Sequence, residues 1–499
     1  MADFSPKPGP GQESFPHNFF YRFLRLFADI RQGEASKALL LALNVFLLLL
    51  AYYILKPLRE ALLLVDKDSA VVKSCLGGAQ AVLFVFVIKG FSRLASKVPR
   101  HILITWTTLF FISNIIVFYF LSLGGMPVKT MGIVFFVWVG IFNYFVIAQF
   151  WGFANDLYSD DVGKRTFPLI AFGATLGGVV GTLPALRKLR DLLGGRWEYK
   201  LMLIAGTILL LCIGLARYIH RREVRKTRDE REKGLAGAEE KARVQEQPLK
   251  AGGGFRLVFK SRYLLFIALL IGLYNFVNAT GEYIISAVTV NTELSKKVPQ
   301  QMTTDLPKPV SLSEKSAEGA PVRQEEKPGT DMEKSIHRAF MNYQLLTNLI
   351  ALIIQLFLVS RIFKWVGVGG ALFFLPLIAL GGYALISFGA VLVIVRWVKS
   401  LENGTDYSLQ NTAKAALFLV TPREEKYKAK AAIDTFFVRG GDTVSALAVL
   451  AGTQLLGLKI ERYALLNVLV VILLIAICFK IIKEYKKRKA EADGKSGMA

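Results

Sequence analysis

Charged side chains interrupt the first apolar segment of this chain, where they could take part in chemistry. The segment runs through Tyr52 to Leu55 and is then broken by Lys56, Arg59 and Glu60 before apolar residues resume. These three charges have the spacing i, i+3 and i+4, so one face of a helix can carry them all. A charge at mid-membrane costs about 2.5 to 3.5 kcal/mol on insertion scales, so it should face protein or water. Two interpretations are open: a polar site inside the membrane, or a helix that ends near Leu55 with its charges at the interface.

A second set of polar residues occurs in the segment YNFVNATGEYIISAV. Its members Asn275, Asn278 and Glu282 have the spacing i, i+3 and i+7, which places them on one helix face. Long apolar flanks on both sides make an interfacial position a poor explanation for Glu282. This carboxylate could serve transport, or it could pair with a cation from the first half such as Arg59, and the two roles are compatible.

The densest polar set lies in the last third of the chain. Its members are Arg396, Lys399, Glu402, Asn403, Asp406, Gln410, Asn411, Lys414, Lys426, Lys428, Lys430, Asp434 and Arg439. Lys430 and Asp434 are at i and i+4 and could pair with each other. Lysines clustered at the mouth of a cavity could otherwise attract a polyphosphate. An excess of cations at several segments favours an anionic substrate over a cation or a sugar.

The stretch FWGFANDLYSDDVGKRTFPLIAFGATLGGVVG, residues 150–181, places an unusual number of polar groups between two apolar helices. An apolar helix ends in Asn155 and Asp156, and a charged turn that contains Lys164 and Arg165 follows. A helix with small residues at four-residue spacing comes next, at Gly173, Gly177 and Gly181. Such spacing favours close helix packing over a binding loop.

This stretch resembles the corresponding segment of the ATP/ADP translocases of chlamydial, rickettsial and plastid type. Members of that family carry a similar FWGFAN stretch, a charged turn and a Gly-rich helix. The string KAKAAIDTFFVRGGD is similar to the family's Lys-Ala-Ala-Ile-Asp motif, with Lys430 and Asp434 on the motif's lysine and aspartate. The resemblance also places Arg59 and Glu60 on a Lys-Asp pair whose lysine is implicated in nucleotide binding, and Glu282 on a functional acidic residue. A second acidic residue of the family has no counterpart, because residues 131–149 contain no Asp or Glu.

We therefore expect two groups of site residues. The first binds substrate and comprises Lys56, Arg59, Asn155, Glu282, Asn411, Lys414 and Lys430. The second gates the site or balances its charge and comprises Glu60, Asp156, Lys164, Arg165, Asp434 and Arg439. We expect no catalytic residue, metal or cofactor. No GxxxxGK[ST] motif is present for nucleotide hydrolysis, so gradients should drive transport.

The elements that carry these residues are predicted to be membrane helices. The chain has 499 residues, of which 53% are hydrophobic, with a mean hydropathy of +0.42, and many apolar runs approach the roughly 20 residues that span a bilayer. We predict an all-α polytopic protein with about twelve spans. The predicted spans are 38–65, 74–88, 101–123, 131–156, 167–186, 199–219, 263–290, 339–360, 370–387, 390–419, 431–456 and 463–482.

The two halves resemble each other, because the stretches after the fourth and tenth spans both combine a charged turn with a small-residue helix. Two parallel six-helix repeats of major-facilitator type are the simplest account. The predicted divisions are an N-terminal tail and surface helix (1–37), the first bundle (38–219), a basic linker (220–262), the second bundle (263–482) and a basic tail (483–499). A polar external loop is predicted at 292–338.

The formal net charge of +24 lies mostly in tails and between spans, which is typical of positive-inside topology and not of nucleic-acid binding. We expect both termini and the linker in the cytoplasm. One loop does not fit this topology, because its cations would lie outside the cytoplasm. They are Arg187, Lys188, Arg190, Arg196 and Lys200. No signal or transit peptide is evident. We expect a bacterial inner-membrane protein that is a monomer.

Three functions are considered. The first is a secondary transporter that exchanges or imports nucleotides of ATP/ADP type by alternating access. The second is a transporter of the same fold for another phosphorylated or organic anion. The third is a membrane enzyme or scaffold, and this class is disfavoured because no catalytic constellation is evident.

Overall fold

A computed structural model describes residues 35–304 and 328–496, apart from 96–97, 99, 159, 233–253 and 423–428. The described residues form helices and turns, with no strand among them. The helices before the linker are α2 Ala35–Leu63, α3 Ser69–Ala95, α4 Arg100–Leu123, α5 Val128–Leu157, α6 Asp160–Val180, α7 Ala185–Leu193 and α8 Trp197–Glu232. Those after it are α10 Gly254–Lys260, α11 Arg262–Thr304, α12 Pro328–Ile353, α13 Val359–Ala371, α14 Phe374–Phe388, α15 Leu392–Thr405, α16 Asn411–Leu417, α17 Lys430–Ala432, α18 Val438–Gln454 and α19 Ile460–Ser496. The all-α fold class is confirmed.

Within the described residues, seven helices are long and apolar enough to cross a membrane, and the bent pair α6 and α7 would make an eighth. Two shorter apolar helices lie at Ser69–Phe84 and Phe374–Phe388. Large apolar side chains remain exposed, such as Trp106, Phe120 and Phe479. A surface of this kind suits lipid and marks a multi-pass membrane protein. The number of twelve spans stays a prediction.

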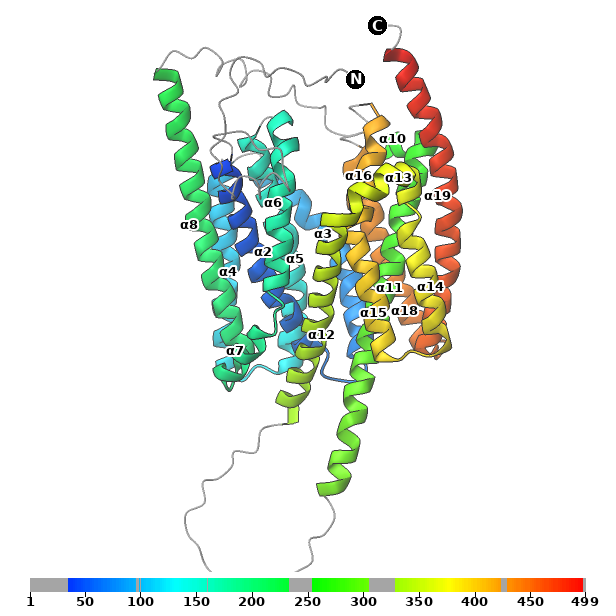
Figure 1. Cartoon of the computed structure of the whole chain (residues 1–499). Coiled ribbons are helices and arrows are strands. Elements are labelled where there is room, and N and C mark those ends of the chain that lie inside the picture. Colours follow the sequence, from blue (N-terminus) through cyan, green and yellow to red (C-terminus); the bar gives the residue numbers. More distant parts are fainter. Residues whose placement is uncertain are drawn as a thin grey trace, which may run out of the picture.

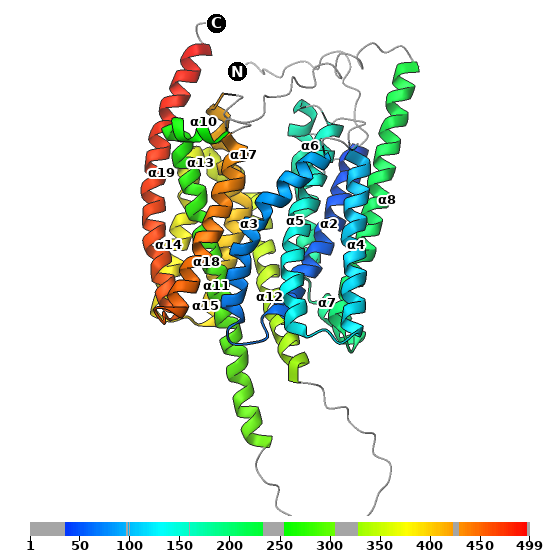
Figure 2. The ribbon, with the colours of Figure 1, turned by 180° about the vertical axis from the view of Figure 1, so that it is seen from behind.

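The helices form two bundles, which Figures 1 and 2 show from opposite sides. One apolar core is built from α2, α4, α5, α6 and α8, which we call the first bundle. The other core is built mainly from the helices that follow the linker, which we call the second bundle. Two helices join them: α3 packs against α18 and α11, and α12 packs against α2 and α6 as well as α15. Residues on α2, α3, α11 and α12 are therefore placed to meet between the bundles.

Several helices run past their predicted ends. The helix α3 extends beyond the predicted span 74–88, and α8 and α11 reach Glu232 and Thr304 where ends at 219 and 290 were predicted. Hydropathy marks only the apolar part of a helix, whereas the backbone hydrogen bonds that hold it continue into polar sequence. The predicted surface helix within residues 1–37 lies outside the described residues.

Within the described residues, three complete π-helical turns interrupt the second bundle. They are η1 Ile354–Leu358, η2 Asp406–Gln410 and η5 Ile433–Phe437. One of them contains a residue predicted for the site, Asp434 in η5, and η2 contains Asp406 of the densest polar set. Single π-helical turns inside α-helices occur frequently at functional sites.

The glycines of α6 allow it to pack closely on α2. A Cβ at Gly177 would lie 2.3 Å from the carbonyl oxygen of Phe46, and one at Gly173 would lie 2.5 Å from that of Ala42. The interpretation of this spacing as helix packing is confirmed.

Replacing Gly177 with alanine should push α6 away from α2 and destabilise the protein by about 1 to 3 kcal/mol, the usual cost of overpacking. Gly214→Ala is the matched control, because nothing lies within 4 Å of a Cβ at that position on α8. Thermal unfolding in detergent should show a lower midpoint for Gly177→Ala alone. Equal midpoints for the two variants would contradict the packing argument.

Candidate functional site

The charges of the first segment lie inside the protein, between the bundles. The helix α2 continues through Leu63, so it does not end near Leu55. Glu60 is only 2% exposed, and the guanidinium of Arg59 donates hydrogen bonds to its Oε1. The alternative of a helix that ends with its charges at the interface is therefore wrong for this segment.

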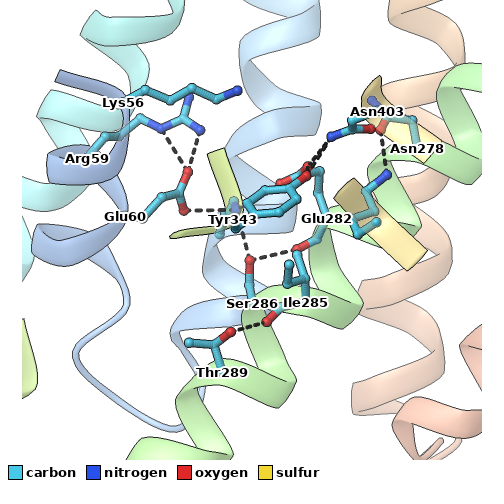
Figure 3. A network of polar contacts seen from close by, with 12 residues as sticks. Lys56, Arg59, Glu60, Asn278, Glu282, Ile285, Ser286, Thr289, Tyr343 and Asn403 are labelled. Atoms are coloured by element: carbon cyan, nitrogen blue, oxygen red, sulfur yellow. Dashed lines mark hydrogen bonds and ion pairs between the residues drawn. The ribbon is translucent and has the colours of Figure 1, made fainter. Parts of the chain in front are cut away.

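A lysine that the sequence analysis missed holds these charges together. The Nζ of Lys73, on α3, lies 2.8 Å from Oε2 of Glu60 and 3.5 Å from Oε2 of Glu282. It also donates a 2.8 Å hydrogen bond to the Oγ of Ser286. The contacts join α2, α3 and α11, and Figure 3 shows Arg59 and Glu60 facing Glu282 and Ser286. The only signal in the sequence was a lysine in the first turns of α3, sixteen residues before the next charge of that helix, Lys89.

Glu282 is held from two further helices. The hydroxyl of Tyr343, on α12, donates a 2.7 Å hydrogen bond to its Oε1, and the Nδ2 of Asn403, on α15, donates one of 3.2 Å to the same atom (Figure 3). The predicted pairing of Glu282 with a cation from the first half exists, but the cation is Lys73 and not Arg59. The side chain of Glu282 is still 27% exposed, so a solute could reach this carboxylate.

A second buried ion pair lies within the second bundle. The Nζ of Lys399 contacts Oε2 of Glu402 at 3.1 Å and Oδ1 of Asn278 at 2.7 Å. The hydroxyl of Tyr383 donates a 2.7 Å hydrogen bond to the same Glu402 oxygen. Because Lys399 is 1% exposed, its charge must be compensated by these neighbours.

Lys56 differs from the cations just described. Its Nζ donates a 3.0 Å hydrogen bond to the neutral amide oxygen of Gln344, on α12. It also lies 5.5 Å from the ring centre of Tyr53 and 6.0 Å from that of Tyr52. Among Lys56, Arg59, Lys73 and Lys399, Lys56 alone has no carboxylate partner in the described structure. It is the charge most available to an anion.

Lys430 and Asp434 do not join this cluster. They pair with each other at 3.7 Å, and their side chains are 44% and 50% exposed. Lys414 similarly pairs with Asp406 at 2.9 Å. The pairing of Lys430 with Asp434, one of the two interpretations of their spacing, is therefore present. The short helix that begins at Lys430 packs beside α10.

The remaining predicted residues are more scattered. Arg439 contacts Asp442 at 3.2 Å and lies 4.4 Å from the ring centre of Phe84, on α3. Asn411 is exposed on α16. The backbones of the last four lie in α5 and α6, and their side chains are outside the described part of the structure; they are Asn155, Asp156, Lys164 and Arg165.

Further contacts join the bundles at the α7 end. The Nη1 of Arg190, which is 2% exposed, donates a 3.2 Å hydrogen bond to the carbonyl oxygen of Lys334, on α12. The rings of Trp197 and His337 lie 4.8 Å apart. Figure 1 shows α7 at the same end as the last turn of α11, opposite the start of α2 and the end of α19. Cations in this loop thus serve packing between bundles.

Comparison with known proteins gives one family match. Residues 129–284 match the family model described as TLC ATP/ADP transporter. This segment includes the FWGFAN stretch and Glu282.

Two curated relatives have names of the same kind. The ADP,ATP carrier protein 1 of Chlamydia trachomatis is 26% identical over 330 residues, which cover 60% of this chain and 54% of the relative. The ADP,ATP carrier protein 1 of Chlamydia muridarum has the same identity and coverage. The chain thus spans about half the length of the curated relatives it matches.

Solved structures share the fold. A bacterial homolog of the human lysosomal transporter Spinster aligns with a TM-score of 0.53 at 13% identity, covering 92% of this chain and 99% of that one. A mutant form of the nucleoside transporter NupG aligns with a TM-score of 0.53 at 12% identity, covering 90% and 99%. These matches support a major-facilitator-like arrangement and nothing finer. The family model and both relatives agree in kind, so the chain is similar to the ATP/ADP translocases.

Proposed function

We propose that this protein is a secondary transporter that exchanges or imports nucleotides of ATP/ADP type by alternating access. One observation carries the proposal: cations of α2 and α3 and the carboxylate of α11 meet between the two bundles, beside a lysine whose partner is neutral. A polyphosphate needs several cations at one place, and charges this far inside a membrane protein usually have a function. The similarity to ADP,ATP carrier proteins supports the same substrate class.

In the proposed site, Lys56 and Arg59 bind phosphate, with Glu282 beside them. Glu60 then balances the charge of Arg59 and Lys73 when no substrate is bound. Lys414 and Asn411 contribute from the second bundle, and Lys430 attracts the anion near the mouth. Asn155 also binds substrate in this proposal, whereas the gating or charge-balancing group comprises Asp156, Lys164, Arg165, Asp434 and Arg439.

The ion pairs suggest why exchange would be obligatory. Lys73 links Glu60 of the first bundle to Glu282 of the second, and Arg190 joins the bundles further toward the α7 end. Separating the bundles at the α7 end without substrate would break these contacts and leave buried charges unpaired, which is costly. A bound polyphosphate replaces the lost carboxylates as a partner for the cations, so the loaded protein reorients more readily than the empty one.

The proposal is tested with proteoliposomes that contain the purified chain. Uptake of labelled ATP should require unlabelled ADP or ATP inside and should be competed by external ADP. Nucleotide uptake into empty liposomes would favour import over exchange. Silence toward all nucleotides, together with uptake of a phosphate ester or dicarboxylate, would favour the alternative of a same-fold transporter for another anion.

Lys430→Ala should raise the KM for nucleotide several-fold without changing the maximal rate, because an exposed lysine attracts an anion through long-range electrostatics. The effect should shrink as salt increases, since screening weakens such attraction. Lys459→Ala removes the same charge from an exposed position at the other end of the second bundle and serves as the control. A lower maximal rate for Lys430→Ala at saturating nucleotide would contradict this role.

The placement in the cell also belongs to the proposal. We place the protein in a bacterial inner membrane, as a monomer with both termini and the linker in the cytoplasm and bundles at 38–219 and 263–482. The starts of α2 and α10 and the end of α19 lie at one end of the molecule (Figure 1), which supports a shared side for these segments. Labelling of single cysteines placed at positions 30 and 490 in sealed inside-out vesicles should succeed at both.

A further inference from the structure

Tyr407 is exposed on the side of its helix that faces the other bundle. It lies in the π-helical turn η2 and is 42% exposed, although the next three residues are buried. Asn403, four residues earlier, contacts Glu282 and Tyr343 and thus marks the inward side. The exposed apolar residues of α15, such as Trp397 and Leu401, follow a different face. The ring of Tyr407 therefore borders the space between the bundles and not lipid.

A second tyrosine lies across from it on the first bundle. The helix α12 packs against both the turn η2, which carries Tyr407, and the helix α2, which carries Tyr53. The ammonium group of Lys56 lies 5.5 Å from the ring centre of Tyr53. The rings of Tyr407 and Tyr53 thus come from helices that border α12, and that of Tyr53 lies beside the cation with a neutral partner.

An amide whose nitrogen has no hydrogen-bond partner in the described structure is placed beside the ring of Tyr53. The Nδ2 of Asn348, on α12, and the ring of Tyr53 both border Gly178, where a Cβ would lie 3.1 Å from the first and 3.0 Å from the second. Asn348 is 4% exposed, and its Nδ2 has no hydrogen-bond partner within the described structure. A buried donor left unpaired is costly, so a ligand that accepts a hydrogen bond there would be favoured.

We infer that Tyr53 and Tyr407 bind the nucleobase of the substrate between the two bundles, with the amide of Asn348 on a polar edge of the base. Every base has a flat π-face that stacks on tyrosine, whereas its edge atoms are what an amide can distinguish. Lys56 lies on the phosphate side of this subsite. The inference rests on the proposed function and adds the part of the ligand that the cations do not recognise.

Binding of two probes to the purified full-length chain separates base from phosphate. The probes are ATP and inorganic tripolyphosphate, which carries no base. Tyr407→Leu should weaken ATP binding by about 5- to 150-fold, the range for loss of one base–aromatic stack, and should leave tripolyphosphate binding unchanged. Tyr407→Phe keeps the ring and should bind ATP like the unaltered chain. Tyr218→Leu, at a 55% exposed tyrosine on α8, is the matched control and should change neither affinity.

Asn348→Ala tests the edge contact separately, and should change the ratio of ATP to CTP affinity while tripolyphosphate binding stays constant. An unchanged ratio would overturn the role of Asn348.

The results also distinguish this inference from the function on which it rests. Suppose that the unaltered chain binds ATP. If Tyr407→Leu then weakens the binding of ATP and of tripolyphosphate equally, or weakens the binding of neither probe, the base subsite is overturned and the transport proposal stands. Loss of ATP binding in Tyr407→Phe as large as in Tyr407→Leu would also overturn stacking. If the unaltered chain binds no nucleotide, both proposals fail.

Discussion

Replacing Lys73 with methionine should lower the free energy of unfolding by about 3 to 5 kcal/mol, the cost of removing one partner from a buried ion pair. Methionine retains most of the length and volume of the side chain but leaves Glu60 and Glu282 facing each other without the cation between them. Glu60 is 2% exposed, so water cannot replace the lost ammonium group. Thermal unfolding in detergent should show a much lower midpoint, and nucleotide uptake should fall with it.

Lys129→Met is the matched control for this prediction. Lys129 pairs with Asp66 at 2.7 Å, but both side chains are 50% exposed, so its loss should cost about 0 to 1 kcal/mol. The double variant Glu282→Gln with Lys73→Met should recover part of the lost stability, because Glu282, whose ion pair in the described structure is with Lys73, becomes a neutral amide while Glu60 keeps Arg59. If Lys73→Met were as stable as the control, the central role given to Lys73 would be wrong.

Lys56→Met should weaken nucleotide binding by about 10- to 150-fold, which corresponds to the loss of one hydrogen bond to a charged group. Its stability should change little, because the bond to the Gln344 amide is the only hydrogen bond from its side chain in the described structure and leaves no carboxylate unpaired. Equilibrium binding of labelled ATP measures the first effect, and thermal unfolding measures the second. This combination of large binding loss and small stability loss is the reverse of that expected for Lys73.

The control for Lys56 is Lys296→Met, which removes the same charge from a 63% exposed lysine that pairs with Glu293 toward the end of α11. It should bind ATP as the unaltered chain does. Equal losses in both variants would mean that overall charge, and not a contact at Lys56, governs binding.

Spacing along one helix was informative about this site. The intervals between Asn278 and Glu282, and between Lys56 and Glu60, predicted that each set shares a face, and both sets do lie between or within the bundles. Lys430 and Asp434 were identified as a possible pair for the same reason, since their contact is local to one turn. Such inferences need only the helix repeat.

Contacts between helices could not be predicted in this way. Lys73 has no charged neighbour along its own helix, and its partners come from α2 and α11. The choice of Arg59 as the partner of Glu282 failed because neither sequence distance nor charge shows which helix packs against which. The same limit applies to Tyr53 and Tyr407, whose relation depends on how the two bundles meet.

The π-helical turn at Asp406–Gln410 has a consequence for changes in chain length. Such a turn accommodates one residue more than a regular α-helical turn, so the residues after it are rotated by about 100° relative to an uninterrupted α-helix. Deleting a single residue within it would restore a regular helix and swing Lys414 and Asn411 to another side. Length variation at this position would thus alter which side of the helix carries these two side chains while every helix stays intact.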